Sequence, residues 1–147
     1  MTEKDLVAVA REAALKAYAP YSHFSVGCAI ESDDGQVVTG ANLENACYRL
    51  GLCAEQSALT AAQHDFGLAR VARIAVAGGD GSSGSLTGDI VCTPCGGCRQ
   101  AILEAAQLSG RDIEILCASG GGEQVERHHI SELIPHGFGP ANLADAG

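Results

Sequence analysis

Positive charge, tryptophan and long apolar runs are all scarce in this sequence. The 147 residues include nine Lys and Arg against 18 Asp and Glu, so the formal net charge is −9 at pH 7. The basic residues are scattered, and no stripe of them could follow a phosphate backbone. No stretch of about 18 apolar residues occurs, which argues against a transmembrane helix. We therefore expect neither a nucleic-acid polymer nor a membrane as partner.

The first residues also lack the features of a secretory signal. Residues 1–5 read MTEKD, without a basic patch followed by an apolar core. Seven cysteines are an odd number, whereas secreted disulfide scaffolds are shorter and usually have an even number. We therefore predict a cytoplasmic protein in which cysteines are core residues, metal ligands or nucleophiles. Cys28, Cys92 and Cys117 lie in apolar stretches and are interpreted as core residues.

Apolar periodicity and turn residues predict alternating helices and strands. The expected helices are 3–18, 53–66, 95–107 and a short one near 130–134. The expected strands are 24–31, 36–44, 73–78, 113–118 and an antiparallel edge strand at 123–127. Residues 79–88 are predicted to form a flexible loop and the tail from Pro140 to be loose. This order indicates a layered α/β fold around one sheet, in a single domain spanning 1–147.

Two short cysteine segments carry the strongest chemical signal. They are Cys53-Ala54-Glu55 and the PCGGCRQ segment at 94–100, and each lies at the start of a predicted helix. The free N–H groups and the dipole of a helix N-terminus favour negative charge, which is expected to lower the cysteine pKa values. Thiolates of Cys53, Cys95 and Cys98 could bind one Zn²⁺ and leave the fourth tetrahedral position for water. An open position is typical of a catalytic zinc.

Glu55 follows Cys53 by two residues, which makes it an awkward fourth ligand. Its carboxylate is near enough to take a proton from a water on the metal and pass it to a substrate nitrogen. Zinc lowers the pKa of such a water to about 7. A Cys-x-Glu segment followed by Pro-Cys-x-x-Cys is the all-cysteine form of the zinc deaminase signature.

Other interpretations of the cysteines stay open at this point. A single Cys-x-x-Cys is also found in redox pairs and in structural zinc sites. A structural site would need a fourth ligand, for which Cys47, Cys92, His128 and His129 are the candidates, none at the usual short spacing. The histidines are expected to be surface or structural residues: His23, His64, His128, His129 and His136.

Further motifs extend a resemblance to one family over nearly the whole chain. Residues 20–27 read PYSHFSVG, 40–48 read GANLENACY and 133–140 read LIPHGFGP, in collinear order with the two cysteine segments. The sequence resembles the small homotetrameric cytidine deaminases. The resemblance implies a three-layer α-β-α sandwich around one mixed five-stranded sheet. It also implies hydrolytic deamination of cytidine and deoxycytidine at C4, in pyrimidine salvage.

The resemblance also implies roles for individual residues. One zinc per chain would be held by Cys53, Cys95 and Cys98, with Glu55 as the proton shuttle. Asn42 and Glu44 would bind the ribose hydroxyls, Phe24 would pack beside the base, and the Ala54 N–H would contact the pyrimidine carbonyl. Phe138 is expected to reach the active site of a neighbouring subunit, with Tyr48 near that site. The active sites of a homotetramer would thus be shared between subunits.

The sequence departs from the family pattern at a few positions. Gln56 stands where many members have an arginine beside the metal cysteines. Zinc with three thiolates has a formal charge of −1, and Gln56 can donate hydrogen bonds but brings no positive charge. We therefore predict a higher pKa for the zinc water than in relatives with arginine, with Arg99 and the helix dipoles as partial compensation. Gly97 and Cys28 replace alanines, which is expected to have slight effects.

Two rival functions remain. A deaminase of the same fold could act on a free base, a modified cytidine or a cytosine-containing antibiotic, although Asn42 and Glu44 favour a ribosylated substrate. A zinc-stabilised binding protein without turnover is the second rival. Glu55 discriminates against that second rival, because a purely structural site has no need of it.

Overall fold

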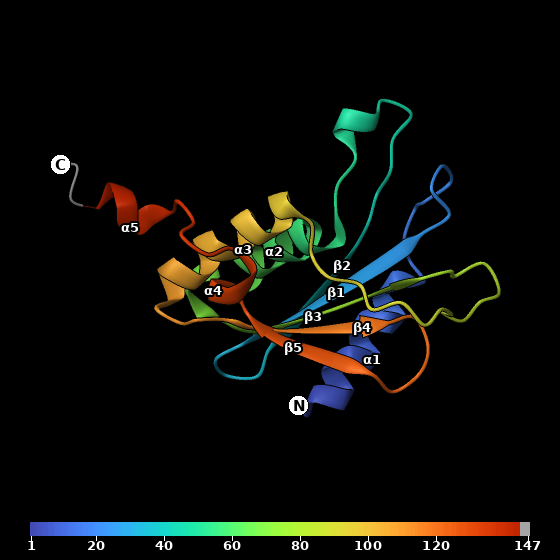
Figure 1. Cartoon of the computed structure of the whole chain (residues 1–147), viewed down its shortest axis with the longest axis horizontal. Helices are drawn as coiled ribbons and strands as arrows, with labels where there is room; N and C mark the ends of the chain where they lie inside the picture. The colour runs from blue at the N-terminus through green and yellow to red at the C-terminus, as the bar shows by residue number, and fades with distance from the viewer. Residues whose placement is uncertain (145–147) are drawn as a thin grey trace.

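A sheet of five strands forms the middle layer of the molecule (Figure 1). The computed structural model describes residues 1–144. The strands are β1 (Ser25–Ser32), β2 (Val37–Ala41), β3 (Val71–Gly79), β4 (Glu114–Ser119) and β5 (Val125–His129), in the spatial order β2-β1-β3-β4-β5. The pair β3 and β4 is parallel and every other neighbouring pair is antiparallel. The predicted mixed sheet and antiparallel last strand are therefore confirmed.

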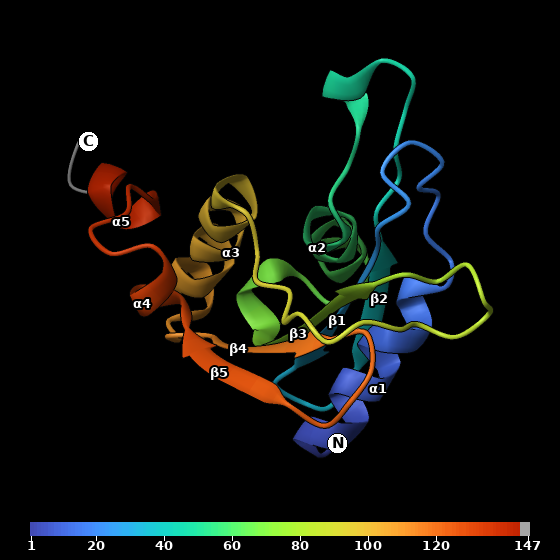
Figure 2. The ribbon, with the colours of Figure 1, turned by 45° about the vertical axis from the view of Figure 1, so that its right-hand side comes forward.

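Helices cover both faces of this sheet (Figure 2). Helix α1 (Glu3–Ala14) packs its buried apolar residues, among them Leu6 and Ala10, against one face. Helices α2 (Ala54–Asp65) and α3 (Gly96–Ser109) cover the other face, where Ala58 and Ile102 belong to the larger core cluster. Helix α3 also connects the parallel strands β3 and β4, a connection that requires a crossover. The predicted three-layer α-β-α arrangement is correct.

The first helix ends earlier than predicted. Thr2 caps its start, because its hydroxyl accepts a hydrogen bond from the Asp5 N–H and the Asp5 carboxylate accepts one from the Thr2 N–H. The helix stops at Ala14 rather than at residue 18. The backbone of Tyr18 instead bonds to the segment after β2, with the Tyr18 N–H donating to the Asn42 carbonyl at 3.0 Å. A tertiary contact thus overrides the helical periodicity.

Two segments predicted to be irregular are partly ordered by contacts. Within 79–88, Asp80 and Thr87 exchange two backbone hydrogen bonds and Leu86 is buried against the sheet. The tail predicted to be loose from Pro140 begins with a one-turn helix, α5 (Pro140–Leu143), while 145–147 lie outside the described residues. Its start is held by Gln107 of α3, whose Oε1 accepts a bond from the Ala141 N–H. The prediction from local composition could not anticipate these tertiary contacts.

Three short helices complete the elements: η1 (Tyr48–Leu50), η2 (Leu68–Arg70) and α4 (Ile130–Leu133). Helix η1 lies at the tip of an arm formed by residues 42–52, which projects beyond the sheet in both overall views (Figures 1 and 2). Strand β2 ends at Ala41, so the residues predicted as its last part, 42–44, belong to this arm. No described helix is long and apolar enough to span a bilayer.

Candidate metal centre and active-site cavity

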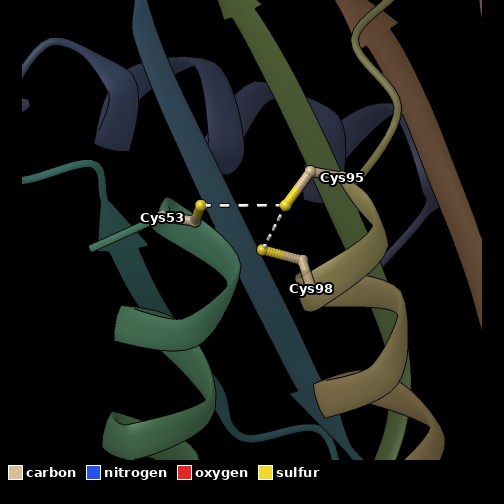
Figure 3. A group of neighbouring side chains, drawn as sticks. All are labelled: Cys53, Cys95 and Cys98. Atoms are coloured by element: carbon tan, nitrogen blue, oxygen red, sulfur yellow. Dashed lines mark hydrogen bonds between the residues drawn. The ribbon is translucent and has the colours of Figure 1, made fainter. Parts of the chain in front are cut away.

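The starts of α2 and α3 bring three thiols together (Figure 3). Cys53 precedes the first residue of α2 and Cys95 precedes the first residue of α3, while Cys98 lies in the first turn of α3. The Sγ atoms of Cys53 and Cys95 are 4.0 Å apart, and those of Cys95 and Cys98 are 3.5 Å apart. All three sulfur atoms lie within 4.8 Å of one another. The predicted ligand set is therefore assembled by the fold.

These sulfur positions fit a tetrahedral zinc ion. A Zn–S bond of about 2.3 Å in a tetrahedron places neighbouring sulfur atoms about 3.8 Å apart. Among residues 1–144, no fourth Cys, His, Asp or Glu joins the group, so neither Cys47, Cys92, His128 nor His129 completes a structural site. Three thiols with one free direction match a catalytic rather than a structural zinc site.

The protein environment favours only one of the three thiolates. Backbone N–H donation, chiefly from Cys98, lowers the pKa of Cys95. Burial raises the pKa of Cys53 and raises that of Cys98 strongly. The sequence-based expectation that helix N-termini lower all three pKa values is therefore wrong for Cys53 and Cys98, because loss of water outweighs the helix end. A bound cation is needed to deprotonate all three thiols.

Glu55 is the only predicted catalytic carboxylate and lies in the first turn of α2. Its side chain is 5% exposed, and it lines the same cavity as Cys53 and Cys95 without joining the sulfur cluster. Burial raises the pKa of Glu55 above its ordinary value. A buried carboxyl with a raised pKa beside a metal site can both hold and release a proton.

Gln56 contacts one of the three thiols directly. Its Nε2 donates a hydrogen bond to the Sγ of Cys98 at 3.8 Å. Arg99, expected from the sequence to compensate the thiolate charge, donates instead to the carbonyl oxygens of Pro94 at 2.8 Å and Leu133 at 3.0 Å. Gln56 thus takes the place beside the sulfur, while Arg99 holds the loop that precedes Cys95.

A cavity of about 330 Å³ opens next to the thiols. It is lined by five predicted residues in addition to two metal cysteines: Phe24, Asn42, Glu44, Ala54 and Glu55. A larger groove of about 830 Å³ lies between α1 and β5, but none of the predicted site residues lines it. The chemistry therefore belongs to the smaller cavity, where the carboxylate and thiols converge.

Tyr48 and Phe138 do not line this cavity. Tyr48 is 78% exposed at the tip of the projecting arm, where its ring meets Tyr21 edge-on at 5.8 Å between centroids. Phe138 is 60% exposed and lies beyond α4, where its carbonyl accepts a bond from Gln100. Within one chain, both aromatic rings are therefore available to solvent or to another subunit.

Asn42 and Glu44 organise the rim of the cavity. The Asn42 side chain accepts a bond from the Val26 N–H at 2.8 Å and donates one to the Phe24 carbonyl at 2.9 Å. Glu44 accepts bonds from the backbone N–H groups of Tyr21 at 2.9 Å and Ser22 at 3.1 Å. These bonds, with one from the Ser22 hydroxyl as the largest contribution, lower the pKa of Glu44. Both side chains thus hold the loop that carries Phe24.

Sequence reasoning missed part of the cavity wall. Val26, Leu52, Cys92 and Thr93 also line it. Cys92, interpreted from the sequence as a core residue, is only partly buried, whereas Cys28 and Cys117 are fully buried as predicted. Burial, and then the charge of Glu55, raises the pKa of Cys92 to about 11, so it is a neutral thiol near pH 7. The signal available in the sequence was its position three residues before Cys95.

Comparison with known proteins agrees with this geometry. Residues 1–109 match the family model of the cytidine and deoxycytidylate deaminase zinc-binding region. A cytidine deaminase from Mycobacterium tuberculosis is 40% identical over 139 residues, which cover 91% of this chain and 87% of that protein. A cytidine deaminase from Halalkalibacterium halodurans is 35% identical over 145 residues, covering 99% of this chain and 100% of that protein.

Solved structures give the same result. The crystal structure of cytidine deaminase from Burkholderia pseudomallei has a TM-score of 0.78 at 38% identity and covers 94% of this chain and 100% of that chain. The crystal structure of cytidine deaminase from Mycobacterium tuberculosis has a TM-score of 0.72 at 34% identity, and the match covers 95% of this chain and 99% of that chain. All three thiols lie within the matched zinc-binding region, which indicates one zinc ion per chain. By sequence, fold and metal centre, the chain belongs to the cytidine and deoxycytidylate deaminase family.

Proposed function

We propose that this enzyme hydrolyses cytidine and deoxycytidine to uridine and deoxyuridine, with release of ammonia, in pyrimidine salvage. The observation that carries the proposal is the buried Glu55 in one cavity with two members of the three-thiol cluster. The names of relatives at 35–40% identity over most of the chain support the substrate. The net charge of −9 favours an uncharged nucleoside over a nucleotide.

The protein side of the mechanism centres on proton transfer. Cys53, Cys95 and Cys98 would hold zinc, which when bound lowers the pKa of water to about 7 and so supplies a nucleophile at neutral pH. Glu55 accepts a proton from the attacking water and delivers it to the pyrimidine N3. It then moves the proton of the new C4 hydroxyl to the exocyclic nitrogen, so that the C4–N bond breaks, ammonia leaves and the C4 carbonyl of uridine forms. Its burial suits this role, because the raised pKa makes both protonation states accessible.

Substrate recognition uses groups around the same cavity. The Ala54 N–H is the first of helix α2 and has no partner within the helix, so it can donate to the pyrimidine carbonyl. Phe24 packs beside the base. Asn42 and Glu44 offer polar atoms to the ribose hydroxyls while they hold the loop that carries Phe24.

The assembly we propose is a homotetramer with shared active sites. The arm 42–52 projects from the rest of the chain (Figure 1). Its exposed apolar residues are Leu43, Tyr48, Leu50 and Leu52. An apolar arm and an exposed Phe138 are costly for an isolated chain and suit contact with another copy. Light scattering should give four times the chain mass. A monomer with full activity would contradict shared sites.

The decisive experiment measures zinc content and loss of cytidine absorbance on one purified sample. We expect about one zinc per chain and stoichiometric uridine. Glu55→Gln should keep the fold and the zinc but lose activity by about 10²–10⁴-fold. An unchanged rate in this variant would contradict the mechanism.

A substrate panel separates the remaining alternatives. Zinc-loaded protein that is inactive on cytidine but active on a free base or a modified cytidine would indicate a different deaminase. Zinc-loaded protein without activity on any of them would indicate a binding protein.

The three thiolates also require a reducing compartment, and we propose the cytoplasm.

A further inference from the structure

One wall of the active-site cavity has no role in the substrate contacts proposed above. Cys92 forms part of this wall and lines the cavity together with Phe24, Val26 and Glu55. The Cys92 N–H donates to the Ala118 carbonyl of β4 at 3.2 Å, which fixes the backbone of the wall on the sheet. A segment of only four residues, 92–95, then leads from this wall to a metal ligand.

Gly78 of β3 sets the position of the Cys92 sulfur. A Cβ atom at Gly78 would lie 2.9 Å from Cζ of Phe24 and 3.0 Å from Sγ of Cys92. The ring and the sulfur therefore both pack on the bare backbone of β3. Because the sulfur cannot retreat into the sheet, the size of the side chain at position 92 decides how far the wall reaches into the cavity.

We propose that Cys92 is a specificity-determining residue whose small side chain sets the size of the amine that can leave from the pyrimidine. This inference rests on the proposed function. In hydrolytic deamination, Glu55 must come within hydrogen-bond reach of the leaving nitrogen, and the reacting carbon must face the metal. Cys92 borders the cavity that contains Glu55 and belongs to the segment that ends at Cys95. Because Cys92 shares this cavity with Glu55 and Cys95, the proposal places a substituent on the leaving nitrogen against this wall.

The test compares three side-chain sizes at one position. The parent enzyme, Cys92→Ala and Cys92→Val are assayed with cytidine, N4-methylcytidine and 5-methylcytidine. Since one methyl group in a pocket changes discrimination by about tenfold or more, Cys92→Val should lower kcat/KM for N4-methylcytidine relative to cytidine by about tenfold. Cys92→Ala should raise that ratio. The ratio for 5-methylcytidine should change much less.

Cys117→Val is the matched control. Cys117 is a fully buried thiol of β4 that does not line the cavity, so this variant should leave both substrate ratios unchanged. If N4-methylcytidine is not turned over, calorimetric dissociation constants in the Glu55→Gln background provide the same comparison.

Two results would overturn the inference. One is an N4-methylcytidine ratio that stays constant across all three residues at position 92. The other is an equal shift for 5-methylcytidine, which would place Cys92 at a different edge of the ring. Failure of the proposed function looks different, because the zinc-loaded parent would then not deaminate cytidine at all.

Discussion

At the scale of single residues, the main departure from the family pattern is the partner of the Cys98 sulfur. A neutral Gln56 donates a hydrogen bond to it, where many members of the family have a charged arginine. Gln56 contributes a donor to the sulfur without contributing a positive charge. Groups that bond to metal ligands orient them and adjust their basicity. The Gln56 side chain should therefore influence zinc affinity although it does not contact the metal itself.

Replacing Gln56 with leucine tests this influence. Gln56→Leu removes the donor to Cys98 while keeping similar size, and we expect zinc affinity or activity to fall by about 10–100-fold. Competition with a chromophoric chelator measures the affinity. Gln124→Leu, on the loop before β5, is the control and should bind zinc like the parent. Equal affinities in all three proteins would show that the Gln56 contact has no effect.

At the scale of elements, close packing of β2 on α2 positions the metal ligands. A Cβ atom at Gly40 of β2 would lie 2.4 Å from the Ala58 backbone nitrogen and 2.7 Å from the Ala54 carbonyl oxygen. Helix α2 begins next to Cys53 and carries Glu55. A glycine on the sheet thus allows the helix to approach closely enough to place these two side chains.

Gly27 of β1 offers a matched comparison on the other face. Its Cβ would lie 1.9 Å from the Ala10 carbonyl oxygen of α1. Gly40→Ala and Gly27→Ala should each destabilise the protein by about 1–3 kcal/mol, because overpacking displaces a helix. Only Gly40→Ala should also weaken zinc binding, since α2 carries metal-site residues and α1 does not. Denaturant unfolding and zinc competition measure the two effects. Equal zinc affinities in both variants would contradict this division between the faces.

An ion-pair cluster joins the β1–β2 turn to the segment before β3 and to the segment that follows α3. Asp33 accepts bonds from Arg70 Nε at 3.0 Å and from Arg111 at 3.2 Å. The bond from Arg70, and to a lesser degree that from Arg111, lowers the pKa of Asp33. A lowered folded-state pKa adds stability that is complete above the unfolded pKa of about 3.9 and is lost as pH falls through the folded pKa.

Asp33→Asn should therefore lower the free energy of unfolding at pH 7 by a small amount, because exposed pairs are screened by solvent. The difference from the parent should shrink progressively below about pH 4, because the Asp33 carboxylate of the unfolded parent chain becomes protonated there before the folded one does. Urea unfolding at pH 7 and pH 3.5 measures it. Asp89→Asn, outside the cluster, serves as control. A difference that stays constant over this range would rule out the ionic contribution.

At the scale of the whole molecule, zinc would connect two helices whose ligands are 42 residues apart in the sequence. A ligand that binds only the folded state stabilises it, by about 4 kcal/mol at 1,000 times its dissociation constant. A strong chelator should therefore lower the thermal midpoint of the parent by several degrees. The midpoint of Cys98→Ala should respond little, because its zinc is already lost. Calorimetry with and without chelator measures the thermal midpoints of both proteins. A parent midpoint that is unchanged by the chelator would argue against a contribution of the metal to stability.

The local chemistry of the site is encoded in short stretches of sequence. The spacing of Cys95 and Cys98 places both thiols at the start of α3. The spacing of Cys53 and Glu55 places one thiol and one carboxylate at the start of α2. Alternating helices and strands, with turn residues between them, predicted the order of the elements and a layered α/β fold, whereas the choice of three layers came from the family resemblance. These features follow from near neighbours in the chain, whose periodicity and turn preferences act locally.

Contacts between distant segments decided the rest. The approach of α2 to α3, and with it the meeting of Cys53 with Cys95, depends on how both helices pack on the sheet. Burial reversed the expected pKa shifts of Cys53 and Cys98, and a bond between Tyr18 and Asn42 ended the first helix early. Packing on Gly78 made Cys92 part of the cavity wall. The sequence by itself determined which groups are available for chemistry, whereas desolvation and long-range packing, which exist only in the folded chain, decided where those groups meet.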